Sequence, residues 1–211
     1  MKGKFITFEG SEGSGKSTQI KLTQKYLEAK GRKVLFLREP GGVRISEQIR
    51  EILLDPKTKG MGDECETLLY MAARAQLVAQ VIIPELNTGT VILCDRFLDS
   101  TVAYQGYGSG VDIDSIKTIG VFAIQGIQPD LTFLFDISAR EGLARIARPK
   151  DRIEKRGLDY HNRVQQGYLA IAGREPQRIK IIDAQKSKEE IESIVRGHID
   201  RLLMRPKLAE R

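Results

Sequence analysis

Short, uninterrupted apolar runs recur along the chain and alternate with segments whose apolar residues are spaced three and four positions apart. Apolar runs of this length are typical of parallel strands buried on both faces, whereas the wider spacing is typical of helices. The alternation predicts an α/β fold: a doubly wound, five-stranded parallel sheet with helices on both faces. The predicted strands are Lys4 to Glu9, Lys33 to Leu37, Val91 to Cys94, Leu131 to Phe135 and Ile179 to Ile182.

Helical spacing is most regular from Glu64 to Leu86, where apolar residues form a continuous stripe. Leu69, Met71 and Val78 make this segment apolar on more than one side, so it belongs in the core or at a subunit interface. Other helices are predicted to begin at Ser17 and near Ile45.

The chain contains no internal repeat, low-complexity tract or linker, and 211 residues suit one compact domain. We therefore expect a single domain over residues 1–211. Residues 205–211 are expected to form a solvated tail, and the glycine-rich run Gly106 to Gly110 a flexible connection.

A glycine-rich loop joins the first predicted strand to the first predicted helix. Its sequence fits G-x-x-x-x-G-K-[ST], the P-loop pattern, in the context that the pattern requires. Backbone N–H groups of such a loop surround phosphates, its lysine reaches the β and γ phosphates, and its hydroxyl can bind Mg²⁺. The expected ATP-binding residues are Gly10, Ser11, Glu12, Gly13, Ser14, Gly15, Lys16, Ser17 and Thr18.

A P-loop alone leaves GTPases, motor ATPases and small-molecule kinases open. The sequence has no N-K-x-D guanine signature and no D-x-x-G switch after a strand, which argues against a GTPase. Asp95 ends the third predicted strand, the place for a carboxylate near the metal, and Arg96 follows it with donors suited to a second phosphate. These features favour a kinase.

The net charge of +6 is compatible with partners that are nucleic acid, anionic membrane or phosphate substrates. Basic residues concentrate between Arg140 and Arg156 rather than along a groove, which favours phosphate substrates over nucleic acid. Cys65 and Cys94 form no zinc-binding or disulfide pattern. The longest apolar stretches are too short for a membrane span, so a soluble, cytoplasmic protein is expected.

Several motifs together resemble bacterial thymidylate kinases over nearly the whole chain. They are FEGSEGSGKST, REPGG, Asp95-Arg96-Phe97, Tyr70 with Arg74, and the run STVAYQG from Ser100 to Gly106. The resemblance implies transfer of the γ-phosphoryl group of ATP to dTMP, with Mg²⁺, giving dTDP and ADP for dTTP synthesis. It also implies a homodimer.

Roles at the reacting end of the site follow from the same resemblance. Lys16 contacts the transferring group, and Ser17 and Asp95 are the metal-side residues. Arg96 and Arg50 hold the dTMP phosphate. Glu12 lies near the sugar 3′-hydroxyl and the metal.

The resemblance assigns the nucleoside end as well. Tyr70 stacks on thymine, and Arg74, one helical turn later, donates to thymine O4, which cytosine lacks. Tyr104 crowds the 2′ position of the sugar and favours the deoxy form. The base is lined by Ser100, Thr101 and Gln105.

Many relatives outside bacteria carry an arginine where this chain has Gly13, so the catalytic arginine must come from elsewhere. Asp151-Arg152-Ile153-Glu154 resembles the lid segment of the bacterial type, here about residues 140–157. Arg152 is implied to reach the transferring phosphoryl group, so its replacement by alanine should lower kcat far more than it raises the KM for dTMP.

Two alternatives stay open from the sequence. One is a kinase for a different nucleoside monophosphate, and the other is a non-catalytic P-loop protein that uses nucleotide to switch partners. The intact Lys16, Asp95 and Arg96 argue against the second.

Overall fold

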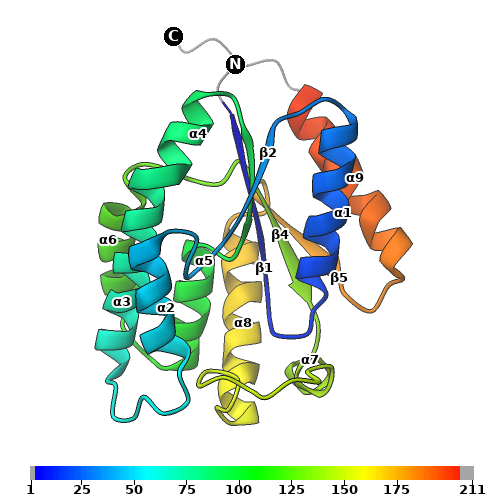
Figure 1. Ribbon diagram of the computed structural model, residues 1–211. Helices are drawn as coiled ribbons and strands as arrows, with labels where there is room; N and C mark the ends of the chain where they lie inside the picture. Colours follow the sequence, from blue (N-terminus) through cyan, green and yellow to red (C-terminus); the bar gives the residue numbers. More distant parts are fainter. Residues whose placement is uncertain (1–2, 205–211) are drawn as a thin grey trace.

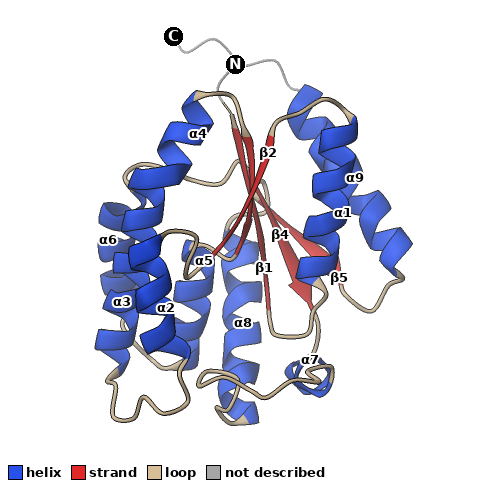
Figure 2. Cartoon of the chain, in the orientation of Figure 1, coloured by secondary structure: helices blue, strands red, loops and turns tan. Residues whose placement is uncertain are grey.

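The computed structural model describes residues 3–204 and contains one parallel sheet with strands in the order β2-β3-β1-β4-β5 (Figures 1 and 2). The predicted doubly wound, five-stranded α/β fold is confirmed. Residues 205–211, predicted to be a solvated tail, lie outside the described residues. The strands are β1 (Lys4–Gly10), β2 (Val34–Arg38), β3 (Val91–Asp95), β4 (Leu131–Asp136) and β5 (Ile179–Asp183).

Helices cover both faces of this sheet. Helices α1 and α9 lie on one face, and α2 to α6 with α8 lie on the other (Figure 1). Two π-helical segments, η1 and η2, continue α-helices without a break. The helices are α1 (Lys16–Ala29), α2 (Arg44–Leu54), α3 (Asp63–Leu77), η1 (Val78–Ile82), α4 (Ile83–Asn87), α5 (Leu98–Thr101), η2 (Val102–Gly108), α6 (Ile113–Ile124), α7 (Ala139–Ala144), α8 (Leu158–Arg174) and α9 (Lys188–Met204).

The three central strands are buried on both faces, as their continuous apolar runs predict. The two edge strands differ from that expectation. Phe36 on β2 is 42% exposed and Ile181 on β5 is 53% exposed. An edge strand has a neighbour on one side only, so helices cover it less completely.

The long predicted helix is present as α3, η1 and α4, which together run from Asp63 to Asn87. By length and apolar composition alone this run could cross a membrane, which the expectation of short apolar stretches overlooked. In the fold it packs on the sheet through Leu77, Val78 and Ile82, and it carries the buried charged residues Glu66 and Arg74. It is therefore built as a core helix.

The first part of the run Gly106 to Gly110 is not the flexible connection that its glycines predict, and only Ser109 and Gly110 lie after the helical segment. Gly106 and Gly108 belong to η2 and are buried. A Cβ at Gly108 would lie 2.7 Å from the Tyr160 ring and 2.8 Å from Val164, so glycine is required here for the close packing of η2 on α8.

Carboxyl ends of all five strands point the same way, and the loops after β1 and β3 meet there because these strands are neighbours in the sheet. The chain passes from β1 to β2 toward one edge of the sheet and from β3 to β4 toward the other edge. A ligand site is expected outside the carboxyl ends at such a reversal.

Packing of α9 on the sheet yields a stability prediction. Ile199 is fully buried in the core with Phe133, whereas Ile194 on the same helix is 36% exposed. We expect Ile199→Ala to lower the free energy of unfolding by about 2–5 kcal/mol, through lost burial and the cavity left behind. Urea unfolding at one protein concentration measures this change.

The matched control is Ile194→Ala, which removes the same atoms from a partly exposed position and should cost less than about 1 kcal/mol. Equal losses from the two variants would contradict the placement of α9 on the core.

Candidate active site

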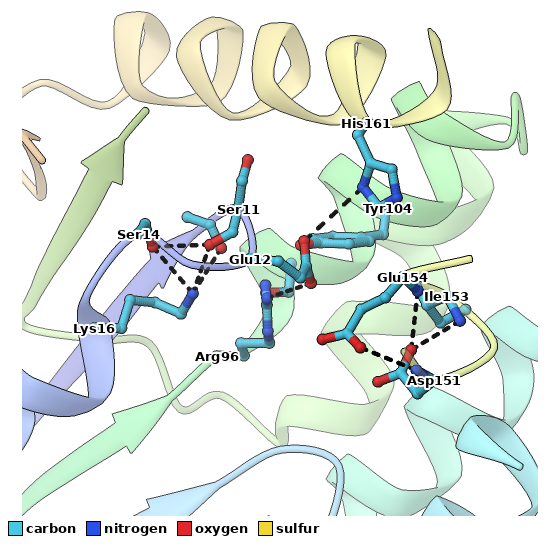
Figure 3. A network of polar contacts seen from close by, with 12 residues as sticks. Ser11, Glu12, Ser14, Lys16, Arg96, Tyr104, Asp151, Ile153, Glu154 and His161 are labelled. Atoms are coloured by element: carbon cyan, nitrogen blue, oxygen red, sulfur yellow. Dashed lines mark hydrogen bonds and ion pairs between the residues drawn. The ribbon is translucent and has the colours of Figure 1, made fainter. Parts of the chain in front are cut away.

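The loop between β1 and α1 folds around its own lysine (Figure 3). Lys16 Nζ donates to the carbonyl oxygens of Gly10, at 2.9 Å, and Ser11, at 3.0 Å, and lies 3.3 Å from Ser14 Oγ. Burial, with the charge of Arg96 nearby, lowers the pKa of Lys16 from 10.5 to about 8. The ammonium group is thus held by neutral oxygens beside the first turn of α1, whose leading N–H groups have no partner within the helix.

Gly13 brings this loop against α7. Its φ is +68°, and a Cβ at this position would lie 2.1 Å from the carbonyl oxygen of Gly142. L side chains rarely adopt this φ, and the obstacle is backbone, so a side chain does not fit. An arginine in the P-loop is therefore sterically excluded here, in keeping with its absence from the sequence.

Ser17 and Asp95 place two oxygen donors where β3 ends. Ser17 Oγ donates to Asp95 Oδ2 at 3.4 Å, while Asp95 Oδ1 is buried without a hydrogen-bond partner in the described part of the chain. Mg²⁺ prefers oxygen ligands and is often bound by one or two carboxylates together with substrate phosphates. The residues present fit a magnesium ion.

Arg96 directly follows β3 in a left-handed backbone conformation, with φ at +73°. Its Nη2 donates to Glu12 Oε1 at 2.8 Å, and its Nη1 donates to Tyr168 OH at 3.0 Å and Ser100 Oγ at 3.3 Å. The guanidinium carbon lies 4.8 Å from the centre of the Tyr104 ring. The side chain is 20% exposed, toward the cavity described below. Arg96 is therefore held firmly but remains accessible.

Glu12 receives donors from several elements (Figure 3). Tyr104 OH lies 2.7 Å from each carboxylate oxygen, and Nδ1 of the buried His161 lies 3.9 Å away. Burial alone would raise the pKa of Glu12, but the positive charges of Arg96 and Lys16 hold it below the usual 4.5. Burial lowers the pKa of His161. Glu12 is therefore anionic at neutral pH, and the ring beside it is uncharged.

Tyr104 and Gln105 come from the π-helical segment η2, a rare form that is frequent at functional sites. The segment directs their side chains in different directions. Tyr104 reaches Glu12 of the P-loop, whereas Gln105 Nε2 donates to Glu66 Oε1 on α3 at 2.8 Å. The segment thereby connects the phosphate-binding loop with the long helix.

Arg74 on α3 is 2% exposed and firmly bonded. Its Nε donates to Glu39 Oε2 at 2.8 Å, Nη1 to Thr101 Oγ1 at 3.0 Å and Nη2 to the Phe97 carbonyl oxygen at 3.0 Å. Tyr70, one turn earlier, shares the face predicted from the spacing, and burial raises the pKa of its hydroxyl. Bonds on three sides fix the orientation of the Arg74 guanidinium.

Two arginines of the segment after α7 lie at the cavity, and one of them contacts the P-loop. Arg145 Nη1 donates to the Gly13 carbonyl oxygen at 3.4 Å. Arg148 forms a bidentate pair with the buried Glu154, at 2.6 and 2.9 Å. Both arginines line the cavity.

Arg152 is placed differently from what the sequence resemblance implies. Its Nε donates to the Leu53 carbonyl oxygen at 2.7 Å and its Nη2 to Glu66 Oε2 at 2.5 Å. These contacts direct the guanidinium toward α2 and α3. It would have to release Glu66 before it could reach a transferring phosphoryl group.

One cavity of about 510 Å³ joins these groups, a volume within the range of small-molecule sites. Arg50, whose Nη1 donates to the Pro40 carbonyl oxygen at 2.8 Å, also faces it. Gly10, Ser11 and Arg152 are not part of its lining. The other residues predicted from the sequence all line it: Glu12, Gly13, Ser14, Gly15, Lys16, Ser17, Thr18, Arg50, Tyr70, Arg74, Asp95, Arg96, Ser100, Thr101, Tyr104 and Gln105.

Several residues of this region were not predicted from the sequence. Glu39 belongs to the REPGG motif, and its place directly after a strand could have singled it out. Glu9 belongs to the FEGSEGSGKST motif and ends the first predicted strand, so the same signal could have singled it out. Glu66 and Tyr168 carry no comparable signal. Their partners lie far away in the sequence, so only the fold reveals their contacts.

Comparisons with known proteins agree with this geometry. The family model for thymidylate kinase matches residues 8–195. A thymidylate kinase of Pelotomaculum thermopropionicum is 52% identical over 193 residues, which cover 90% of this chain and 89% of the relative. One from a Geobacillus species is 48% identical over 195 residues, covering 90% and 93%.

A solved structure is similar as well. The crystal structure of thymidylate kinase from Ehrlichia chaffeensis superposes with a TM-score of 0.77 at 33% identity, covering 94% of this chain and 99% of that one. Matches of this extent, in sequence and in fold, establish that the chain belongs to the thymidylate kinase family.

Proposed function

We propose that this chain transfers the γ-phosphoryl group of ATP to the phosphate of dTMP, giving dTDP and ADP. The observation that carries the proposal is a single cavity with a phosphate-binding loop at one end and the firmly held Arg96 beside it. Membership of the thymidylate kinase family supports the same reaction. Phosphoryl transfer depends mainly on positioning and charge stabilisation, and this cavity provides both.

On the donor side, the ATP phosphates would bind the residues from Gly10 to Thr18. Lys16 would exchange its three neutral oxygen partners for anionic phosphate oxygens, which make shorter and stronger hydrogen bonds. Ser17 and Asp95 would hold Mg²⁺, which supplies positive charge to the phosphate oxygens during transfer.

On the acceptor side, Arg96 and Arg50 would bind the dTMP phosphate, because both line the cavity and a guanidinium suits bidentate contact with phosphate oxygens. Glu12, anionic and bonded to Tyr104, would lie near the sugar 3′-hydroxyl and the metal. Tyr104 itself would crowd the 2′ position and favour the deoxy sugar.

The base would lie between Tyr70 and the far wall of the cavity. Contacts within the described chain use four of the five N–H groups of Arg74. We assign the fifth to thymine O4, so that cytosine would leave a buried donor without an acceptor. The lining around the base would include Ser100, Thr101 and Gln105.

Residues of about 140–157 would serve as a lid on a single domain formed by residues 1–211. Arg145 and Arg148 already line the cavity, and closure over bound substrates would exclude water that otherwise competes for the phosphoryl group. A cytoplasmic location without nucleic-acid or membrane partners remains part of the proposal, and it is supported by the basic residues that line the cavity, among them Arg145 and Arg148.

The acceptor specificity tests the proposal directly. In a coupled assay of ADP release with ATP and Mg²⁺, dTMP should give a kcat/KM at least about 100-fold above that of dCMP, because dCMP lacks the acceptor for Arg74. AMP and GMP should react more slowly still, since Tyr70 and Arg74 are assigned to a pyrimidine ring and a purine would not place its polar edge in the same position.

A different best acceptor in that panel would favour a kinase for another nucleoside monophosphate. Failure of folded protein to release ADP with any acceptor would favour a non-catalytic P-loop protein.

The lid arginines give a second prediction. Arg145→Ala and Arg148→Ala should each lower kcat strongly, toward the roughly 10³-fold effect of arginines that stabilise this kind of transition state. The KM for dTMP should change little in both variants. Steady-state kinetics with both substrates varied would measure these changes.

Arg140→Ala is the control, because Arg140 is exposed and outside the cavity lining. Arg152→Ala belongs in the same series. If only this variant loses kcat, the lid rearranges to release Arg152 from Glu66, and the assignment to Arg145 and Arg148 is wrong.

We also propose a homodimer formed through the side of the molecule that carries α2, α3 and α6. Helix α3 packs against both of its neighbours, and the three helices expose large apolar side chains (Figure 1). Phe122 is 84% exposed and Val121 66%. Burial of these side chains in a second copy would remove them from water. The other exposed apolar side chains on these three helices are Ile45, Ile52 and Leu68.

Phe122→Glu should convert the dimer to a monomer, measured as a halved mass by light scattering after size exclusion, because a charge would be buried in an apolar interface. Ile194→Glu on α9, at the opposite side of the molecule, should leave the mass unchanged. A dimer that survives Phe122→Glu would place the interface elsewhere.

A further inference from the structure

A buried carboxylate lies behind the acceptor arginine. Glu9, at the end of β1, is 1% exposed. Its Oε1 accepts from the Phe97 backbone N–H at 2.7 Å, and its Oε2 accepts from Ser100 Oγ at 2.5 Å and from Tyr168 OH at 3.0 Å. Glu9 therefore bonds the residue that follows Arg96 and two hydroxyls that contact Arg96.

The two hydroxyls connect Glu9 to the guanidinium. Arg96 Nη1 donates to both Tyr168 OH and Ser100 Oγ, and these oxygens lie 2.7 Å apart. When it is ionised, the Glu9 carboxylate only accepts hydrogen bonds. Ser100 Oγ donates to it, and the single Tyr168 hydroxyl hydrogen lies toward Glu9 or toward Ser100, so each hydroxyl oxygen keeps a lone pair directed at Arg96. The two hydroxyl oxygens thereby hold Nη1 of Arg96, while Glu12 holds Nη2.

The backbone at this point also needs support. A left-handed conformation is uncommon for a residue other than glycine, and Arg96 adopts it immediately before the Phe97 N–H that Glu9 accepts. Burial, followed by the charge of Asp99, raises the pKa of Glu9 from 4.5 to about 7. Carboxyl groups with such perturbed pKa values occur preferentially at functional sites.

We propose that Glu9 and Tyr168 are positioning residues for phosphoryl transfer, which hold the Arg96 guanidinium in the orientation that receives the acceptor phosphate. The inference rests on the proposed function and extends it to two residues that do not themselves line the cavity. Glu9 directly precedes the P-loop, so the same residue fixes the acceptor arginine relative to the donor site.

Tyr168→Phe tests the proposal, because it removes one hydroxyl and keeps the ring. Loss of a hydrogen bond to a charged group should lower kcat/KM for dTMP by about 10-fold to 100-fold. The KM for ATP should stay within about twofold of wild type, since no donor-site contact is removed. Kinetics at 25 °C and thermal unfolding would be measured on the same preparations.

The matched control is Tyr160→Phe. Tyr160 lies on the same helix, and its buried hydroxyl has no hydrogen-bond partner within residues 3–204. This variant should retain wild-type kinetics. Glu9→Gln should resemble Tyr168→Phe, because an amide donates where the carboxylate accepts; if it does not fold, Tyr168→Phe decides alone.

The outcomes separate the two proposals. If wild-type protein does not convert dTMP, the proposed function fails. If wild type is active and Tyr168→Phe behaves like Tyr160→Phe, or lowers thermal stability without a selective effect on dTMP, the positioning role is wrong.

Discussion

The ion pair between Arg96 and Glu12 is the interaction on which the rest of the site depends. Its nitrogen and oxygen lie 2.8 Å apart and join the loop after β3 to the P-loop after β1. Because these strands are neighbours, with Phe8 opposite Asp95, the loops that follow them lie side by side in the folded sheet. The pair is partly buried, so removal of either member would leave an uncompensated charge. Sheet order thus sets the distance between the donor and acceptor ends.

Positive charge concentrated in one cavity explains how the site selects phosphates. Burial, and after it the positive charge of Arg96, lowers the pKa of Lys16, so the two cations repel each other across the site. Each cation has hydrogen-bond partners within the chain: Lys16 donates to loop carbonyl oxygens, and Arg96 donates to Glu12 and to hydroxyl groups. Phosphate groups bound between these cations would relieve their repulsion. The positive charges proposed to stabilise phosphoryl transfer would therefore also favour substrate binding.

Local patterns in the sequence predict the fold and part of the cavity lining, because the P-loop, the strand-end Asp95 and the Tyr70 to Arg74 spacing each act over a few residues. Other lining residues, among them Arg50, Thr101 and Gln105, follow only from the resemblance to thymidylate kinases. Other features depend on distant contacts. The packing of Gly108 on α8, the contact of Arg152 with Glu66 and the exposed faces of the edge strands follow from neighbours that the sequence does not specify. The contacts of Glu9 could not be predicted for the same reason, since its partners come from residues around 97–100 and from α8.

Calorimetric titration of the protein with dTMP and with thymidine, without ATP, tests the central claim most directly. The two ligands differ only by the phosphate, which we assign to Arg96. Charge-assisted hydrogen bonds should make dTMP bind about 10-fold to 100-fold more tightly than thymidine. Equal affinities would contradict an acceptor-phosphate site at Arg96.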